Sequence, residues 1–334
     1  MKNKRKKLTF PLLLLLLAAW LSLPAYAVQT GEVLVPGGQA VGILLECDGV
    51  LVSSLAEVPT DCGTAAPARD AGMQSGDRII SLNGEPIRCG TDFLAALERL
   101  DGSGVTLSFC RGDTEKSVEI SPVRDIHGDW KLGLLLRSGI NGLGTVTFWD
   151  PQTGLYGALG HGVSLPEEQA RMSISGGRIT SIDVTDVVKG FPGTPGELCG
   201  LPEEDVILGT VDKNTDVGIF GHAAALTEAK PLPVASEAEI CTGEASILST
   251  VDGEGVREYS AEIVRITHGG DDPRQMTIRI TDPALLEMTG GIVQGMSGSP
   301  IVQNGKLVGA VTHVLVSDPS KGYGVSIENM LAAA

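Results

Sequence analysis

The residue best placed to do chemistry in this sequence is a serine that stands between glycines near the C-terminal end. Ser297 lies in the run GMSGSP at residues 295–300, a pattern that fits the nucleophile loop of an acyl-transfer enzyme. Glycine reaches backbone angles that other residues avoid, so such a loop can turn tightly. The amide groups of Gly295 and Ser297 are then predicted to point at one position and form an oxyanion hole. Taken alone, the loop fits an ordinary glycine and serine turn in a β-protein equally well.

A nucleophilic serine needs a base, and His161 is the leading candidate among five histidines. It stands between two glycines after an apolar stretch, where the end of a strand would hold an imidazole exposed. His161 precedes Ser297, which is the order of base and nucleophile in chymotrypsin-like enzymes. His222 has a similar setting of small residues and ranks second. We expect solvated side chains for His127 and His268, and for His313 a place on the strand after the serine, bonded to its neighbours or touching substrate.

The acid that would orient the histidine is harder to assign. In a double-barrel enzyme this acid usually lies well before the nucleophile, which favours Asp212, between His161 and Ser297. Asp282, in the run ITDP, lies closer to Ser297. Further candidates are Asp183, Asp186 and Asp216. Each of these residues would serve equally well in a turn or a helix cap, so spacing alone leaves the role open.

The candidate residues need strands to position them, and the sequence predicts many. Strands are predicted at residues 130–136, 144–149, 291–293, 300–303 and 306–316, with a hairpin turn at Asn304-Gly305. The 334 residues are enough for about two domains. The 44 glycines, the low aromatic content and the short aliphatic runs predict a mostly β chain with tight turns.

Charge and cysteine content narrow the range of functions. The net charge of −16 argues against nucleic-acid binding, which depends on lysine and arginine at phosphates. The six cysteines include no CxxC pair, which disfavours zinc and thioredoxin-like sites. No metal or organic cofactor is implied. Disulfides and buried free thiols remain equally open for these cysteines.

The N-terminus has the pattern of an export signal. Residues 1–27 combine a basic start, an apolar run from Leu8 to Leu23, and the sequence Ala25-Tyr26-Ala27 of a signal-peptidase-like site. The run is short for a membrane span, so a cleaved signal is favoured over an uncleaved anchor. Either way, residues 28–334 are predicted to lie outside the cytoplasm. No later segment is apolar for long enough to cross a membrane.

The first predicted domain, residues 28–122, resembles the PDZ family. The resemblance rests on the glycine-rich run PGGQAVGILL at residues 36–45 and on PARDAGMQSGDRIISLNGEPI at residues 67–87. PDZ domains take up a peptide C-terminus or an extended segment as an extra strand. The resemblance implies that Val41, Gly42 and Ile43 line this peptide groove. The two apolar side chains would also serve as core.

The second predicted domain, residues 126–334, resembles the stage IV sporulation protein B peptidase family. The matching runs are GTVTF at 144–148, YGALGH at 156–161, GIFG at 218–221, ITD at 280–282 and the stretch from Thr289 to Val316. The resemblance implies a chymotrypsin-like double β-barrel with the triad His161, Asp282 and Ser297. With the first domain, the expected fold class is mostly β, a PDZ domain followed by a serine peptidase domain.

The same resemblance implies a function in sporulation signalling. The protein would cleave itself and a membrane-bound regulator in the space outside the forespore membrane. Cleavage of the regulator would free an intramembrane protease to activate a late sporulation sigma factor. The alternative is a catalytically inactive adaptor that binds a membrane partner through its PDZ domain.

Overall fold

The structure is a computed structural model that describes residues 33–112, 114–164, 171–267 and 272–334. The predicted export segment and His268 lie outside these described residues. The described chain is mostly β-structure, as predicted, with a few short helices. No helix in these described ranges is long and apolar enough to cross a membrane.

One part of the chain, here called the first lobe, is a small sheet with two short helices. It contains β5 (Arg78–Leu82), β7 (Val105–Arg111), β8 (Thr114–Ile120), α2 (Pro67–Asp70), α3 (Gly90–Leu97) and the far end of β2 (Ala40–Leu55). Its shorter strands are β3 (Val58–Thr60), β4 (Gly63–Ala65), β6 (Glu85–Pro86), β9 (Val123–Arg124) and β10 (Trp130–Lys131). Phe93 of α3, Ile79 and Leu107 are buried in one apolar cluster that closes this lobe.

A second sheet region surrounds an apolar cluster that includes Val41, Tyr156 and Ile179. Its strands are β1 (Val33–Pro36), the first part of β2, β11 (Leu134–Trp149), β12 (Leu155–Ala158), β13 (Ile174–Val188), β14 (Glu197–Thr210), β15 (Lys213–Thr215), β16 (Gly218–His222) and β17 (Leu232–Pro233). These strands join those of the first lobe in one continuous, open sheet.

The C-terminal region is a closed six-stranded barrel. Its strands pair in the order β18 (Gly243–Ser249), β19 (Arg257–Ile266), β20 (Met276–Ile280), β23 (Lys321–Ser326), β22 (Lys306–Val314) and β21 (Pro300–Gln303). Its helical elements are η1 (Glu237–Glu239), α4 (Pro283–Thr289) and α5 (Ile327–Ala333). Ile247, Ile263 and Ile278 are fully buried inside it. Of the predicted pair of barrels, this is the one that closes in the described residues.

The predicted hairpin turn between β21 and β22 is confirmed. Asn304 and Gly305 both have positive φ, 52° and 73°, the conformation that a two-residue hairpin turn requires. The turn brings β22 back along β21, so that Pro300 pairs with Ala310. This hairpin carries the residues that follow Ser297 back past the serine.

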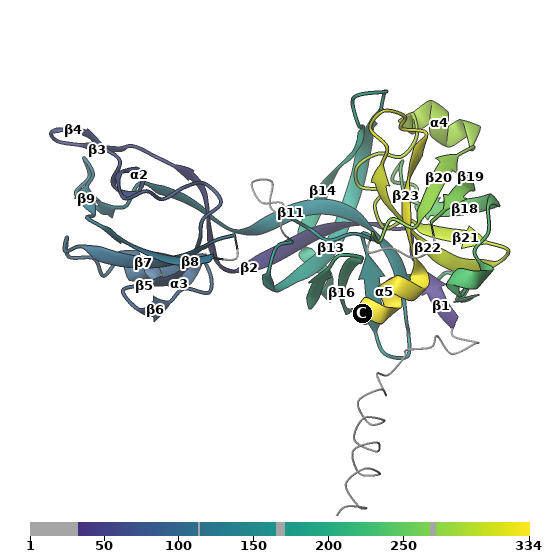
Figure 1. Cartoon of the computed structure of the whole chain (residues 1–334), viewed down its shortest axis with the longest axis horizontal. Coiled ribbons are helices and arrows are strands. Elements are labelled where there is room, and N and C mark those ends of the chain that lie inside the picture. Colours follow the sequence, from purple (N-terminus) through teal and green to yellow (C-terminus); the bar gives the residue numbers. More distant parts are fainter. Residues whose placement is uncertain (1–32, 113, 165–170, 268–271) are drawn as a thin grey trace, which may run out of the picture. The chain divides into compact units, whose positions relative to one another are not determined.

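The strand pairing differs from the predicted boundary between the domains. β1 pairs with β11 and β17, and residues 42–47 of β2 pair with β13, so residues 33–47 complete the sheet around His161. Figure 1 shows β2 and β11 as two long neighbouring strands. β2 continues from the sheet region into the first lobe, where it pairs with β5, and β11 returns from the first lobe to the sheet region. The first lobe is therefore inserted into the sheet region rather than placed before it.

The same pairing corrects the predicted peptide groove. Val41, Gly42 and Ile43 pair with β11 on one edge, and Gly42 and Ile43 pair with β13 on the other. A peptide adds as a strand only where an edge is unpaired. Val41 and Ile43 are also almost fully buried. These residues therefore form part of the sheet core, and they offer no edge to an incoming peptide.

Candidate active site

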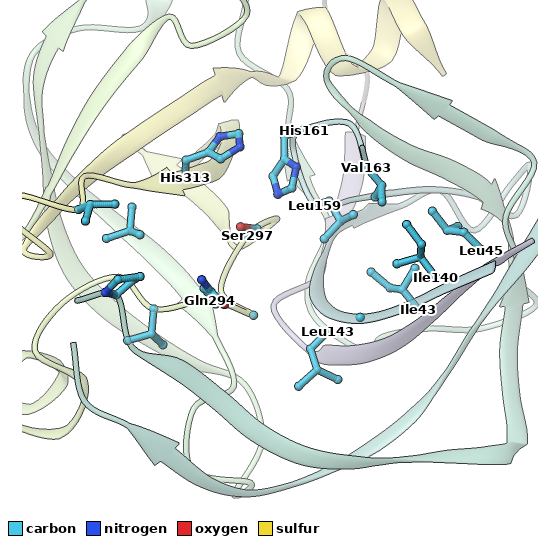
Figure 2. A pocket seen from close by; sticks show the side chains of 16 residues that line it. Ile43, Leu45, Ile140, Leu143, Leu159, His161, Val163, Gln294, Ser297 and His313 are labelled. Carbon is cyan, nitrogen blue, oxygen red and sulfur yellow. The ribbon is translucent and has the colours of Figure 1, made fainter. Parts of the chain in front are cut away.

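His161 and Ser297 line one cavity of about 440 Å³, shown in Figure 2. The sheet region contributes one wall, with Ile43, Ile140 and Leu143 among its members, and the C-terminal barrel contributes the other. In the close-up, the rings of His161 and His313 lie on the same side of Ser297. The predicted base and nucleophile, which are far apart in the sequence, are thus brought together.

The loop that carries Ser297 is held by two buried threonines of β11. The Thr145 hydroxyl donates to the Gly295 carbonyl at 2.8 Å, and the Thr147 hydroxyl donates to the Gly298 carbonyl at 2.8 Å. Gly298 has φ of 99°, and a Cβ there would lie 2.0 Å from the backbone carbonyl oxygen of Thr145. Only glycine lets the loop approach β11 this closely. The serine is therefore fixed by contacts from the sheet region as well as by its own barrel.

The predicted oxyanion donors are the N–H groups of Gly295 and Ser297. Gly295 has φ of 96°, a value that favours glycine. Within the described residues, the N–H groups of Gly295 and Ser297 donate to no protein acceptor, whereas the neighbouring Met296 N–H donates to Val293 and the Gly298 N–H to Val311. Free amide donors beside a nucleophile can stabilise a developing oxyanion.

The Ser297 hydroxyl donates its proton to the backbone carbonyl of Thr312, at 2.5 Å. Thr312 is a buried residue of β22, next to His313. A hydroxyl has one proton to donate, so this bond excludes simultaneous donation from Ser297 to His161. Rotation of the serine side chain would be needed to direct the hydroxyl proton at the histidine.

His161 is positioned by an unusual turn after β12. Leu159 and Gly160 both have positive φ, 69° and 68°, which is uncommon for a leucine. A Cβ on Gly160 would lie 3.1 Å from the Val311 carbonyl oxygen and 3.3 Å from Ala310 Cβ, so the turn packs closely on β22. Two left-handed residues in succession turn the chain toward the barrel. This turn carries His161 to the strand that binds the serine hydroxyl.

The segment after His161 is held by Asn214 of β15. Its side-chain oxygen accepts from the Val163 N–H at 2.9 Å, and its amide donates to the Val163 and Met172 carbonyls at 2.9 and 2.8 Å. One side chain thus fixes the backbone two residues beyond the base. We infer that Asn214 is a positioning residue for His161.

The protonation state of His161 follows from its surroundings. Nδ1 lies 2.8 Å from the Gly162 carbonyl oxygen, which can only accept, so Nδ1 carries the proton and Nε2 keeps its lone pair. Burial lowers the pKa of His161 below its ordinary value of 6.5, and the bond to Gly162 opposes this shift. His161 is therefore neutral at pH 7 and available as a base.

His313 lies beside His161, with 4.3 Å between the ring centroids. Although part of its ring remains exposed, loss of water and then the proximity of His161 and Arg274 lower the pKa of His313 to about 4, and Asp272 opposes the shift. His313 is therefore neutral at pH 7. It lies on β22, the strand after the serine, as predicted, and it lines the cavity.

The structure does not bring Asp282 to His161. Asp282 is the N-cap of α4, where its carboxylate accepts from the N–H groups of Ala284 and Leu285 at 3.0 Å. Its second oxygen accepts from Ser260 at 3.3 Å. The predicted contact with the base is therefore absent from the described residues, because helix capping and β19 occupy the carboxylate.

Asp212, the other acid considered, is paired with the other histidine considered. Asp212 Oδ2 lies 2.7 Å from His222 Nδ1, and both side chains are about half exposed to solvent. Neither residue lines the cavity of Ser297. Thus no carboxylate among the described residues bonds to His161, and the Gly162 carbonyl fixes its tautomer.

Sequence reasoning missed three residues that shape the site. Thr145 and Thr147 alternate along the run TVTF, and two hydroxyls on one face of an apolar strand were a usable signal of a polar contact in a core. Asn214 gave no comparable signal. A polar residue in a polar stretch reads as a turn, and its partners lie far away in the sequence.

Two protein-family models match this chain. Residues 128–331 match the family described as SpoIVB peptidase S55, and residues 43–121 match the PDZ domain. The class is therefore a serine peptidase with a PDZ domain, which implies a protein substrate and peptide binding. Since the peptidase match covers more than half of the chain, the chain belongs to the SpoIVB peptidase S55 family. The resemblance found in the sequence is confirmed.

Solved structures show only distant likeness. The PDZ domain of an SdrC-like protein from Listeria monocytogenes is 24% identical and has a TM-score of 0.22, over 27% of this chain and 87% of that one. The inactive form of the Rv3671c protease from M. tuberculosis is 18% identical, with a TM-score of 0.33 over 58% and 82%. Human heparin binding protein is 13% identical, with a TM-score of 0.28 over 54% and 74%. The comparison with curated proteins gave no match.

Proposed function

We propose that this protein is a serine endopeptidase in which Ser297 is the nucleophile and His161 the general base. The observation that supports this most directly is the shared cavity, where a neutral histidine and a serine meet two unpaired amide donors. A serine is a weak nucleophile unless a nearby base removes its proton. Each requirement for acyl transfer has a named group in this cavity.

The proposed reaction begins when Ser297 rotates from the Thr312 carbonyl toward Nε2 of His161. Ser297 Oγ then attacks the peptide carbonyl carbon as its proton passes to His161. The N–H groups of Gly295 and Ser297 stabilise the oxyanion of the tetrahedral intermediate. His161 next protonates the leaving amine, and the acyl-enzyme forms. Water, deprotonated by His161, attacks the carbonyl carbon of this ester, and His161 returns the proton to Ser297 Oγ as the bond to the acyl group breaks.

The proposed biological role follows from the family and from the export signal in the sequence. The protein would act outside the cytoplasm, at the outer face of the forespore membrane. It would cleave itself and a membrane-bound regulator, and so lead to activation of an intramembrane protease and a late sporulation sigma factor. Incubation of the full-length protein with a candidate regulator ectodomain, followed by mass mapping of the products, tests this role.

The chemistry is tested with a fluorophosphonate probe on the full-length protein. Ser297 should be labelled in the wild type and in His222→Ala, and labelling should be lost in Ser297→Ala and His161→Ala. Labelling of His161→Ala at the wild-type rate would overturn the assignment of the base. Circular dichroism of each variant shows whether the fold is kept.

The alternative is a non-catalytic adaptor, and one contact favours it. The Ser297 hydroxyl is bonded to Thr312 rather than to His161, as expected for a serine that is not poised to react. An adaptor would bind a membrane partner through the PDZ domain and would leave the probe unreacted at Ser297. Labelling at Ser297 therefore decides between the two functions.

A further inference from the structure

The two walls of the cavity around Ser297 share one chemical character. Among the described residues that line it, none is acidic, and none is basic apart from His161 and His313. Both histidines are neutral at pH 7, because their pKa values are lowered. This uniformity is informative in a chain that carries 41 acidic and 25 basic residues.

The wall from the C-terminal barrel carries three valines beside the polar residues Gln294, Ser297 and His313. Val293 comes just before the serine loop and is fully buried, while Val314 and Val316 follow His313. Pro195, from the loop between β13 and β14, also lines the cavity. A substrate side chain placed here exchanges water for hydrocarbon.

The wall from the sheet region is aliphatic as well. Ile43 of β2 and Ile140 and Leu143 of β11 face the cavity, as Figure 2 shows. Gly142 also lines this wall, its φ is an ordinary one, and a Cβ there would meet no atom within 4 Å. The wall therefore has open space where the chain carries no side chain.

We infer that this peptidase cleaves between residues with uncharged, aliphatic side chains on both sides of the scissile bond. The inference rests on the proposed function, since it takes Ser297 as the point of attack. The amides of Gly295 and Ser297 fix the scissile carbonyl, so the flanking side chains lie against the two walls. An aliphatic side chain gains by leaving water there, whereas a charged one would lose its hydration without gaining an oppositely charged partner among the described lining residues.

The primary test uses full-length protein and a set of peptides that vary only at the two residues flanking one bond. Peptides with Leu or Val at both positions should be cut. Lysine or glutamate at either position should lower kcat/KM by about 100-fold or more, because a charged side chain that leaves water without an oppositely charged partner is strongly disfavoured. Equal cleavage of charged and aliphatic peptides would overturn the inference.

Two variants test the walls separately. Gly142→Phe should fill the open space and lower the preference for Leu over Ala by about tenfold, in line with the effect of small size changes in apolar pockets. Val316→Asp, at a position that is 47% exposed, should raise cleavage at Lys relative to Leu by about tenfold or more. Leu201→Phe, at an exposed position outside the cavity, is the control and should change neither ratio.

Probe labelling separates the possible failures. A protein that is labelled at Ser297 and cuts peptides without regard to the flanking residues keeps its proposed function and loses the inferred specificity. A protein that is neither labelled nor active loses both. Unchanged ratios in Gly142→Phe and Val316→Asp, with labelling retained, would also count against the inference.

Discussion

His161 and His222 have similar settings in the sequence and opposite settings in the structure. Both follow a glycine at the C-terminal end of a strand: His161 lies just after β12, and His222 is the last residue of β16. These two strands are antiparallel partners, with Leu155 opposite His222. Because the strands run in opposite directions, residues after their C-terminal ends lie at opposite ends of the pair. One histidine therefore reaches the cavity of Ser297, and the other is about 60% exposed beside Asp212.

Under the proposed function, a bonded carboxylate does not by itself mark a catalytic histidine. His222 has the acid partner that a triad histidine would need, but among the described residues neither His222 nor Asp212 lines the cavity of Ser297. His161 lines that cavity and bonds a carbonyl instead of a carboxylate. Position beside a nucleophile and unpaired amide donors is the stronger criterion, and electrostatic stabilisation is usually the largest contribution to catalysis.

The largest effects on turnover are expected when each histidine is replaced in turn. Ser297→Ala and His161→Ala should each lower turnover by about 10⁴-fold or more, since nucleophile and base act as a unit. His222→Ala should leave turnover unchanged within error. Single-turnover cleavage of an aliphatic peptide measures all three. A larger loss in His222→Ala than in His161→Ala would exchange their roles.

The next largest effect is expected from Asn214, whose side chain holds the backbone that follows His161. Asn214→Ala frees the Val163 backbone, and turnover should fall about 10- to 100-fold because small displacements of a catalytic group are costly. Asp212→Asn, in the same part of the chain but paired with His222, should cost about tenfold or less. A loss in kcat with little change in KM is the expected signature for Asn214→Ala. If both variants retain wild-type kcat, Asn214 does not position His161.

Asp282→Asn should lower turnover less than the predicted role of Asp282 as the triad acid would require. An orienting acid would cost about 10⁴-fold when replaced by asparagine. A helix cap replaced by asparagine keeps most of its bonds, so we expect turnover within about tenfold and a stability loss of about 1 kcal/mol or less. Thermal unfolding and single-turnover rates measure both. A loss of about 10⁴-fold in turnover at an unchanged melting temperature would show that Asp282 is the acid that orients His161.

The smallest expected effect is in the pH dependence, as a shift of the acid limb of the kcat/KM profile. Activity requires neutral His161, and burial lowers its pKa below 6.5, so the acid limb of kcat/KM should have its midpoint below pH 6.5. The depressed pKa values also mean that the unfolded chain binds more protons, so stability should fall as pH drops below 6.5. For His313, this loss should continue to about pH 4. A midpoint at or above 6.5 in the rate profile would contradict the burial of His161.

The nucleophile loop and the hairpin after it were predictable because their signals are local. Gly295, Gly298 and the Asn304-Gly305 turn are dictated by backbone angles that a few neighbouring residues reveal. The candidacy of His161 came from its small neighbours and its order relative to Ser297. The structure brought these two residues together as expected.

The predictions that the structure contradicts concern residues whose roles depend on partners distant in the sequence. The run from Val41 to Ile43 is apolar whether its strand lies at an edge or in the centre of a sheet, and only the pairing with β13 distinguishes the two. An aspartate before a proline and a short apolar stretch suits a helix cap and a triad equally well. Its partners, Ser260 and the start of α4, decided in favour of the cap.

The insertion of the first lobe between β2 and β11 makes the peptidase a discontinuous unit. A single cut in the backbone between residue 121 and residue 134 would leave residues 33–47 on one fragment and Ser297 on the other. The two fragments would remain associated, because β2 still pairs with β11 and β13 in the middle of the sheet. Cleavage at this boundary would therefore yield a nicked protein that elutes as one species in gel filtration and separates only in denaturant. Such a cut would leave the first lobe joined to the sheet region by one chain connection instead of two, and it would not release a separate protease.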